Sequence, residues 1–135
     1  MGRIGETIAK RALGFDATIH YHSRTPKNAD FIYHCTVKEL AAAVDVLFVI
    51  TPGGASTYHL VNDEVMNALG TQGMLINVAR GSVVDETALI AALQDGRLGS
   101  AGLDVFEQEP KIPDALKMMD NVVLVPHIGL SLIHI

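Results

Sequence analysis

The sequence has little cysteine, and its acidic side chains outnumber its basic ones. Only one cysteine, Cys35, occurs, so no disulfide can form within the chain, which suits a reducing compartment. Lysine and arginine total 10 against 15 aspartate and glutamate residues, and the net charge of −5 argues against nucleic-acid binding, which needs a basic face. No apolar run approaches the roughly 20 residues of a membrane-spanning helix, and no basic-then-apolar signal segment opens the chain. We therefore expect a cytoplasmic protein that binds neither nucleic acid nor a membrane.

The hydrophobic pattern of the 135 residues indicates a single α/β domain. Short apolar segments alternate with helical patterns, as in parallel βαβ units. The segment "DVLFVI" is apolar almost throughout, which is typical of a strand covered on both faces of a sheet. Strands are expected at residues 17–21, 45–50, 74–78, 100–105 and 121–126, with a weaker one at 31–35.

Residues with capping chemistry mark where the predicted helices begin and end. Thr36 and Glu39 have the spacing of a capping box, and Asn62 and Asp85 stand where the side chain of an N-cap is expected. Gly70 follows the helix that Asn62 would begin, as expected at a helix C-terminus. These positions predict three helices between the strands.

The first residues match the second half of a dinucleotide-binding glycine motif. Gly2 and Gly5 lie three apart at the start of the helical segment "GRIGETIAKRALGF", where such a motif brings a helix N-terminus to a pyrophosphate. The first glycine of the motif and the strand that precedes it are absent from the chain, and a strand candidate follows at the right place. We predict a Rossmann-type doubly wound parallel sheet that is truncated, with its first strand missing.

Three strand ends place an arginine, a carboxylate and a histidine at one rim of the predicted sheet. Arg80 follows one strand, Glu107 and Glu109 follow the next, and His127 follows the last. Each residue alone is more often an ordinary surface or loop residue. Ligands of open parallel sheets bind outside the carboxyl ends of the strands, where these groups meet. An arginine that pairs with a carboxylate, beside a histidine that moves a proton, suits hydride transfer on a 2-oxo or 2-hydroxy acid.

The residues that follow the first strand bear on the cofactor. Domains that bind NAD place an acidic residue about 20 residues after the glycines, whereas this chain has Ser23, Arg24 and Thr25 there. Serine and arginine suit the 2′-phosphate of NADP(H), although Arg24 is also compatible with a solvated loop charge. We predict a preference for NADP(H), with NAD(H) possible as cofactor.

Four segments together resemble a known family. "GRIG", "LINVARGSVVDETALIAAL", "GLDVFEQEP" and "NVVLVPHIG" are similar to the nucleotide-binding domain of the D-isomer-specific 2-hydroxyacid dehydrogenases. The resemblance covers residues 2–129. The "YHSRTP" and "VPHIG" segments are most similar to the glyoxylate/hydroxypyruvate reductase branch, which tends to use NADPH. The resemblance implies a small 2-oxo or 2-hydroxy acid as substrate and a homodimeric full-length protein.

The resemblance also implies a role for each matching residue. Arg80 would bind the substrate carboxylate, Glu109 would pair with His127, and His127 would be the acid/base. Asp104 would meet the nicotinamide carboxamide. No metal site is expected. The residues expected to bind the cofactor are Gly2, Arg3, Ile4, Gly5, Ser23, Arg24, Thr25, Thr51, Pro52, Val78, Ala79, Asp104 and Gly129.

The chain departs from the family pattern at both ends. Residues 1–129 are expected to be a partial NAD(P)-binding domain, and the substrate domain of the family is absent. The final segment 130–135, "LSLIHI", can be read as CTG TCT CTT ATA CAC ATC, which resembles a transposon-adapter end, so we interpret it as an adapter-derived tail. We expect the isolated chain to be unstable and inactive, although its full-length protein would be an NAD(P)-dependent dehydrogenase or reductase.

Two other functions remain open from the sequence. Some relatives are non-catalytic corepressors that sense a dinucleotide, and these can keep the Arg-Glu-His trio. NAD-dependent phosphoglycerate and D-lactate dehydrogenases share the fold, but they would usually have an acidic residue at the position of Ser23.

Overall fold

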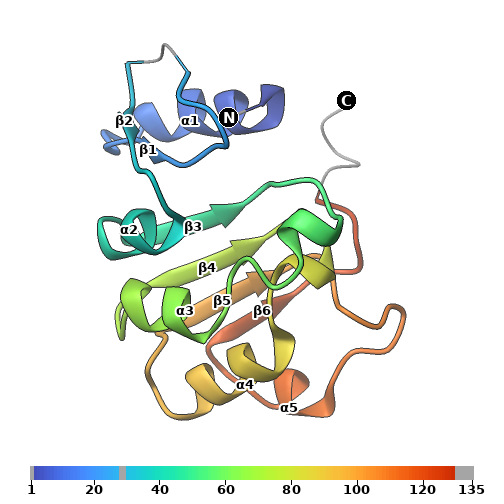
Figure 1. The fold of residues 1–135 in the computed structure, drawn as a ribbon. Helices are drawn as coiled ribbons and strands as arrows, with labels where there is room; N and C mark the ends of the chain where they lie inside the picture. Colours follow the sequence, from blue (N-terminus) through green and yellow to red (C-terminus); the bar gives the residue numbers. More distant parts are fainter. Residues whose placement is uncertain (1, 28–29, 130–135) are drawn as a thin grey trace.

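The structure is a computed structural model that describes residues 2–27 and 30–129, so the predicted tail at 130–135 lies outside the described residues. Helices and strands alternate along the chain (Figure 1). Each predicted strand forms, although β1 and β2 have two residues each. The elements are α1 (Arg3–Leu13), β1 (His20–Tyr21), β2 (Ile32–Tyr33), α2 (Val37–Ala42), β3 (Val46–Val49), η1 (Ala55–Thr57), α3 (Asp63–Leu69), β4 (Met74–Asn77), η2 (Gly81–Val83), α4 (Glu86–Gln94), β5 (Ser100–Leu103), α5 (Asp114–Lys117) and β6 (Val122–Leu124).

The strands form two parallel sheets. One contains β3, β4, β5 and β6 in that order, and the other pairs β1 with β2. Figure 1 shows β1, β2 and α1 next to the β3 edge of the larger sheet. In a doubly wound sheet of strand order 3-2-1-4-5-6, the first strand separates the second from the fourth. The break between β1 and β3 therefore falls where the sequence predicts the missing strand.

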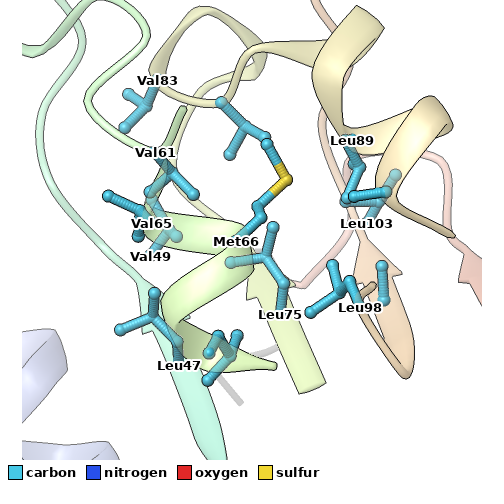
Figure 2. Packing of buried hydrophobic residues seen from close by; sticks show 14 of the residues in the cluster. Leu47, Val49, Val61, Val65, Met66, Leu75, Val83, Leu89, Leu98 and Leu103 are labelled. Atoms are coloured by element: carbon cyan, nitrogen blue, oxygen red, sulfur yellow. The ribbon is translucent and has the colours of Figure 1, made fainter. Parts of the chain in front are cut away.

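The hydrophobic core lies on one face of the four-stranded sheet. Leu47, Leu75 and Ala101 are in register on neighbouring strands, and all three are buried. Met66 of α3 and Leu89 of α4 pack against this face (Figure 2). Because side chains alternate between the two faces of a strand, this register directs every second residue of each strand into the core.

The opposite face of the same sheet is only partly covered by the described residues. Val46 and Phe48 of β3 are each 41% exposed, and Met74 of β4 and Val123 of β6 are exposed as well. The expectation that segment 45–50 is covered on both faces is therefore wrong for the described part of the chain. The physical reason is that the apolar sides of α2, α3 and α4 all join the core on the other face.

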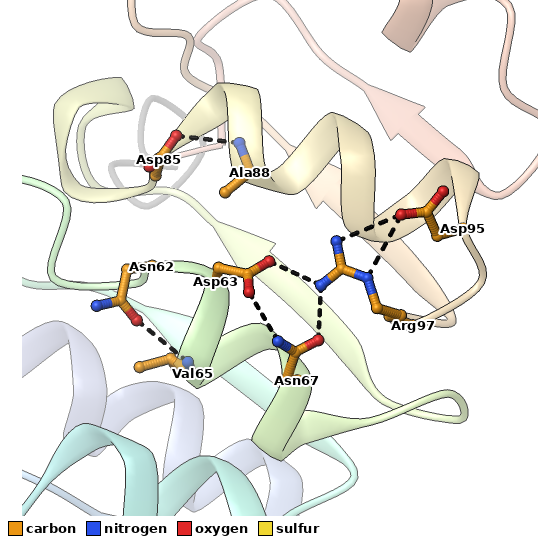
Figure 3. A network of polar contacts seen from close by, with 8 residues as sticks. All are labelled: Asn62, Asp63, Val65, Asn67, Asp85, Ala88, Asp95 and Arg97. Carbon is orange, nitrogen blue, oxygen red and sulfur yellow. Dashed lines mark hydrogen bonds and ion pairs between the residues drawn. The ribbon is translucent and has the colours of Figure 1, made fainter.

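The predicted helix caps are confirmed. The Thr36 hydroxyl accepts a hydrogen bond from the Glu39 backbone N–H at 3.1 Å, and the Glu39 carboxylate accepts one from the Thr36 N–H at 3.2 Å. The side chains of Asn62 and Asp85 accept backbone N–H bonds at the starts of α3 and α4 (Figure 3). Gly70 ends α3 with φ of 86°, which glycine adopts without steric cost.

Arg97 joins α3 to the end of α4. Its guanidinium donates to the Asp63 carboxylate at 2.7 Å and to the Asn67 side-chain oxygen at 2.6 Å (Figure 3). The same side chain lies 3.5 Å from the carboxylate of Asp95. The hydrogen bond from Arg97 lowers the pKa of the exposed Asp63 carboxyl.

Candidate active site

The candidate site lies at the carboxyl ends of the parallel strands. Strands β3 to β6 run in the same direction, so the loops that follow them meet at one rim (Figure 1). Thr51 follows β3, Arg80 follows β4, Glu109 follows β5 and His127 follows β6. The parallel topology therefore places the predicted catalytic groups on one side of the domain, as the sequence indicates.

Glu109 and His127 form a direct pair. The Nδ1 atom of His127 lies 3.0 Å from Oε2 of Glu109, and the two side chains are 46% and 38% exposed. The other carboxylate oxygen of Glu109 accepts a hydrogen bond from the Phe106 backbone N–H at 3.0 Å. That bond, followed by the His127 contact and the nearby charge of Arg80, lowers the pKa of Glu109. The pair can therefore hold an ionised carboxylate against one imidazole nitrogen while the other nitrogen faces a ligand.

Arg80 is exposed at the end of β4, where the buried Asn77 shapes the backbone. The Asn77 amide donates to the Arg80 carbonyl at 3.1 Å, and its oxygen accepts from the Ala79 N–H at 3.1 Å. Gly81 lies so close to the Phe106 backbone that a Cβ atom there would overlap it. Glycine at this position therefore brings the Arg80 turn against the turn that carries Glu109.

Asp104 holds the loop that carries His127. This residue is 1% exposed, and its two carboxylate oxygens accept the backbone N–H groups of Ile128 at 2.7 Å and Gly129 at 2.8 Å. His127 itself has φ of 55°, an unusual value for a residue with a side chain. The carboxylate thus fixes the backbone just after His127, while its predicted contact with the nicotinamide carboxamide stays a prediction.

The predicted phosphate-binding end fits a dinucleotide. Gly2 is the extended N-cap of α1, and no side chain of the described residues caps this helix. The backbone N–H groups of its first turn, at Arg3, Ile4 and Gly5, are therefore placed to bind an anion. On the rim, the buried hydroxyl of Thr51 has no hydrogen-bond partner among the described residues. A buried polar atom normally has a partner, so the Thr51 hydroxyl is a feature that a bound ligand would explain.

The loop after β1 presents Arg24 to solvent. The Ser23 hydroxyl donates to the Thr25 carbonyl at 2.7 Å, and the Tyr33 hydroxyl donates to the Ser23 carbonyl at 3.3 Å. These bonds define the backbone on both sides of the exposed Arg24 side chain. Its contact with a 2′-phosphate stays a prediction.

The remaining predicted cofactor residues line the ends of β3 and β4. The carbonyl of Pro52 accepts a hydrogen bond from the Thr57 hydroxyl at 2.7 Å, and the Val78 N–H donates to the Val49 carbonyl at 3.3 Å. Ala79 is buried. These positions lie on the same rim as the Glu109–His127 pair, which is the placement that the sequence predicts.

A second histidine–glutamate pair was not identified from the sequence. The Nε2 atom of His59 lies 2.9 Å from Oε1 of Glu107, and its Nδ1 atom lies 3.7 Å from the Asp85 carboxylate. His59 stands nine residues beyond the predicted strand 45–50, in the same loop as Thr51 and Pro52 but farther from the strand end. The signal for it in the sequence is its place in the loop that follows a parallel strand.

Residues 2–27 and 30–129 contain no helix with both the length and the apolar composition of a membrane span. They also hold no group of three or more histidine, cysteine, aspartate or glutamate side chains arranged to bind a metal ion.

The fold and the site together define a dinucleotide-binding domain of the dehydrogenase type. Residues 1–129 match the family model described as "D-isomer specific 2-hydroxyacid dehydrogenase, NAD binding domain". This chain belongs to that family. The match confirms the resemblance expected from the sequence and the Rossmann-type α/β fold.

The chain is similar to named reductases. It is 51% identical to hydroxyphenylpyruvate reductase of Plectranthus scutellarioides and 52% identical to glyoxylate/hydroxypyruvate reductase A of Arabidopsis thaliana, in both cases over 96% of this chain and 42% of the relative. A solved structure of NADPH-dependent glyoxylate/hydroxypyruvate reductase from Sinorhizobium meliloti, in complex with NADP and malonate, is 55% identical with a TM-score of 0.93. That similarity covers 94% of this chain and 40% of the other. The chain therefore spans well under half the length of these relatives.

Proposed function

We propose that this chain is the cofactor-binding domain of a reductase that uses NADPH to reduce glyoxylate or hydroxypyruvate to the corresponding 2-hydroxy acid. The observation that carries the proposal is the Glu109–His127 pair at 3.0 Å on the rim near Arg80. The reductase names of the relatives favour this activity over a dinucleotide-sensing corepressor and over the NAD-dependent dehydrogenases considered from the sequence.

The three rim residues divide the chemistry between them. Arg80 offers a planar guanidinium that can bind the carboxylate of a 2-oxo acid through two parallel hydrogen bonds. His127 keeps Nδ1 toward Glu109, so Nε2 can donate a proton to the carbonyl oxygen of the substrate. Glu109 lies 3.0 Å from Nδ1 of His127 and orients the ring. When bound, the reduced nicotinamide supplies the hydride.

The preference for NADPH rests on the loop after β1. Arg24 is exposed there, and positions 22–25 directly after β1 carry no acidic side chain that would repel a 2′-phosphate. The S. meliloti relative, which has NADP bound, supports the same preference. Arg24→Ala should weaken NADPH binding by about tenfold to a hundredfold, since a hydrogen bond to a charged group contributes roughly 1.5–3 kcal/mol. NADH binding should be unchanged.

In this proposal, the full-length protein has parts outside these 135 residues. A substrate-binding domain would supply the second wall of the cleft, because the chain spans 42% of its first relatives. We further propose that the full-length protein is a cytoplasmic homodimer and that residues 130–135 derive from an adapter. The isolated chain is then expected to be unstable and inactive.

The experiment uses the full-length protein. NADPH oxidation is followed with glyoxylate, hydroxypyruvate and pyruvate for the wild type and for Arg80→Gln. The wild type should reduce the first two acids, and Arg80→Gln should raise KM by about tenfold or more through loss of the charged hydrogen bonds. NADPH affinity is the control and should not change. Tighter binding of NADH than NADPH, or no turnover with any 2-oxo acid, would contradict the proposal.

A further inference from the structure

We propose that His59 is a positioning residue for this reaction. It holds the side chain of Glu107 and thereby fixes the turn that sets Glu109 against His127. The inference rests on the proposed function, because Glu109 and His127 are the groups whose geometry it controls. His59 does not touch the reacting atoms and acts only through the turn.

The side chain of His59 is held between carboxylates. Its Nε2 atom lies 2.9 Å from Oε1 of Glu107, and its Nδ1 atom lies 3.7 Å from Oδ2 of Asp85. The Tyr58 ring stacks on the imidazole with a centroid separation of 3.9 Å, and the Tyr58 hydroxyl lies 3.4 Å from the same Glu107 oxygen. Both ring nitrogens therefore face acidic groups, and one ring face is covered.

The backbone of His59 is anchored independently of its side chain. The His59 N–H donates to the Ser82 carbonyl at 2.9 Å, and the Val61 N–H donates to the Val83 carbonyl at 3.0 Å. These bonds tie the loop to η2, next to Arg80. His59 has φ of 48°, a left-handed conformation that asparagine and glycine adopt more readily than other residues. The imidazole is thus presented from a fixed support.

Glu107 is held at its backbone as well as at its side chain. Its N–H donates to the Glu86 carboxylate at 3.2 Å, while its own carboxylate meets His59. The preceding residue, Phe106, donates its N–H to Glu109 at 3.0 Å, and this bond is the main cause of the lowered pKa of Glu109. A shift of Glu107 would therefore move the donor that holds the Glu109 carboxylate.

The charges around His59 explain why a histidine stands there. Asp85 and Glu107 face its two nitrogens, the Tyr58 hydroxyl shares Glu107, and Glu86 lies behind the Glu107 backbone. Burial, together with the charge of Glu107, raises the pKa of Glu86. In this acidic cluster the imidazole can donate to Glu107, a contact that a neutral apolar side chain cannot replace.

The test compares His59→Gln with His59→Asn in the full-length enzyme. The glutamine amide reaches about as far as Nε2 of histidine and can keep the bond to Glu107, whereas the asparagine amide is too short. Asparagine suits the positive φ better, so a purely backbone role would favour His59→Asn. We expect His59→Gln to keep kcat within about threefold and His59→Asn to lose about tenfold to a hundredfold, as small misplacements of catalytic groups do. NADPH affinity should not change in either variant.

A second readout follows Glu109 directly. Carboxyl NMR titration should show the pKa of Glu109 rising toward its ordinary value in His59→Asn but not in His59→Gln. Equal kcat for the two variants, or an unchanged pKa of Glu109 in His59→Asn, overturns the inference. If the wild type lacks turnover, the proposed function fails while the titration still decides the role of His59. If His59→Asn does not fold, Glu107→Ala takes its place with the same expected results.

Discussion

Two histidine–glutamate pairs on one turn differ in what surrounds them. The rim pair, Glu109 with His127, has side chains 38% and 46% exposed, and the anchor pair, Glu107 with His59, has side chains 26% and 27% exposed. The distances within the pairs are 3.0 and 2.9 Å, and both histidines have positive φ. Glu107 and Glu109 are two residues apart, and each makes nearly the same contact with a histidine in a different environment.

The difference lies in the second nitrogen of each ring. His59 faces a carboxylate with both nitrogens, because Asp85 lies 3.7 Å from Nδ1. His127 uses Nδ1 for Glu109, and its Nε2 has no hydrogen-bond partner in the described part of the chain. A histidine that exchanges a proton with a substrate needs one nitrogen free, whereas a histidine that holds a turn does not. This difference fits the proposed roles, in which one pair serves chemistry at the rim and the other serves positioning at the anchor.

The largest expected effect is the loss of kcat when His127 is replaced, compared with the loss when His59 is replaced. His127→Asn in the full-length enzyme should lower kcat by about 10²- to 10⁴-fold, the usual contribution of general acid–base catalysis. Steady-state rates of NADPH oxidation measure it, with NADPH affinity as the control. The same substitution at His59 should cost less, since that ring acts only through the turn. A larger loss at His59 than at His127 would reverse the assignment of the two pairs.

The next effect is a loss of stability when Asp104, which binds the backbone just after His127, is replaced. Asp104→Asn replaces one carboxylate oxygen with an NH₂ group, which leaves the N–H of Ile128 or Gly129 without its acceptor. An unsatisfied buried group costs about 1–3 kcal/mol, so the free energy of unfolding should fall by that amount. Denaturant titration of the full-length protein measures the change. Unchanged stability would mean that the loop after β6 does not depend on Asp104.

The pH dependence of the rim pair follows from the lowered pKa of Glu109. A carboxyl whose pKa is lower in the folded state stabilises the protein above its ordinary pKa, and the contribution is lost as the pH falls through the lower value. His127→Asn removes one cause of the shift, so the pKa of Glu109 should rise toward its ordinary value of 4.5. Carboxyl NMR titration of both proteins measures the rise. An identical titration curve for Glu109 in the two would show that the 3.0 Å contact is absent in solution.

The smallest expected effect concerns Asp85, which both caps α4 and faces His59 of the anchor pair. Asp85 accepts the Ala88 N–H at 3.0 Å and also faces His59. Because asparagine caps helices as well as aspartate, Asp85→Asn should change the free energy of unfolding by under about 0.5 kcal/mol, whereas Asp85→Ala should cost about 1 kcal/mol. Thermal or denaturant unfolding distinguishes the two. A large loss in Asp85→Asn would mean that its charge, and not its capping bond, matters.

The sequence predicts the four-stranded sheet well because its signals are local. The capping residues Thr36, Asn62 and Asp85 each act within four residues of themselves, and the core strands have continuous apolar runs. The rim is also predictable from the sequence, because the residues that follow parallel strands lie on one side of the sheet. Glu109 and His127 are 18 residues apart, yet their contact follows from this topology.

The features that the sequence did not predict depend on packing. The exposure of Val46 and Phe48 cannot be read from an apolar run, because the pattern does not say which elements cover each face. The contact between His59 and Glu107 spans 48 residues and depends on a positive φ and on close approach of two turns. Neither has a periodic or compositional signal.

The most direct test of the account compares Glu109→Gln with Glu107→Gln in the full-length enzyme. Both changes remove one negative charge from the same turn, and steady-state kinetics with hydroxypyruvate and NADPH measure the effect of each. We expect Glu109→Gln to lower kcat by about a hundredfold or more, because the proton donor loses its carboxylate. Glu107→Gln, which can still accept a hydrogen bond from His59, should lose about tenfold or less. Equal losses, or a loss confined to Glu107→Gln, would contradict the division between a catalytic rim pair and a positioning anchor pair.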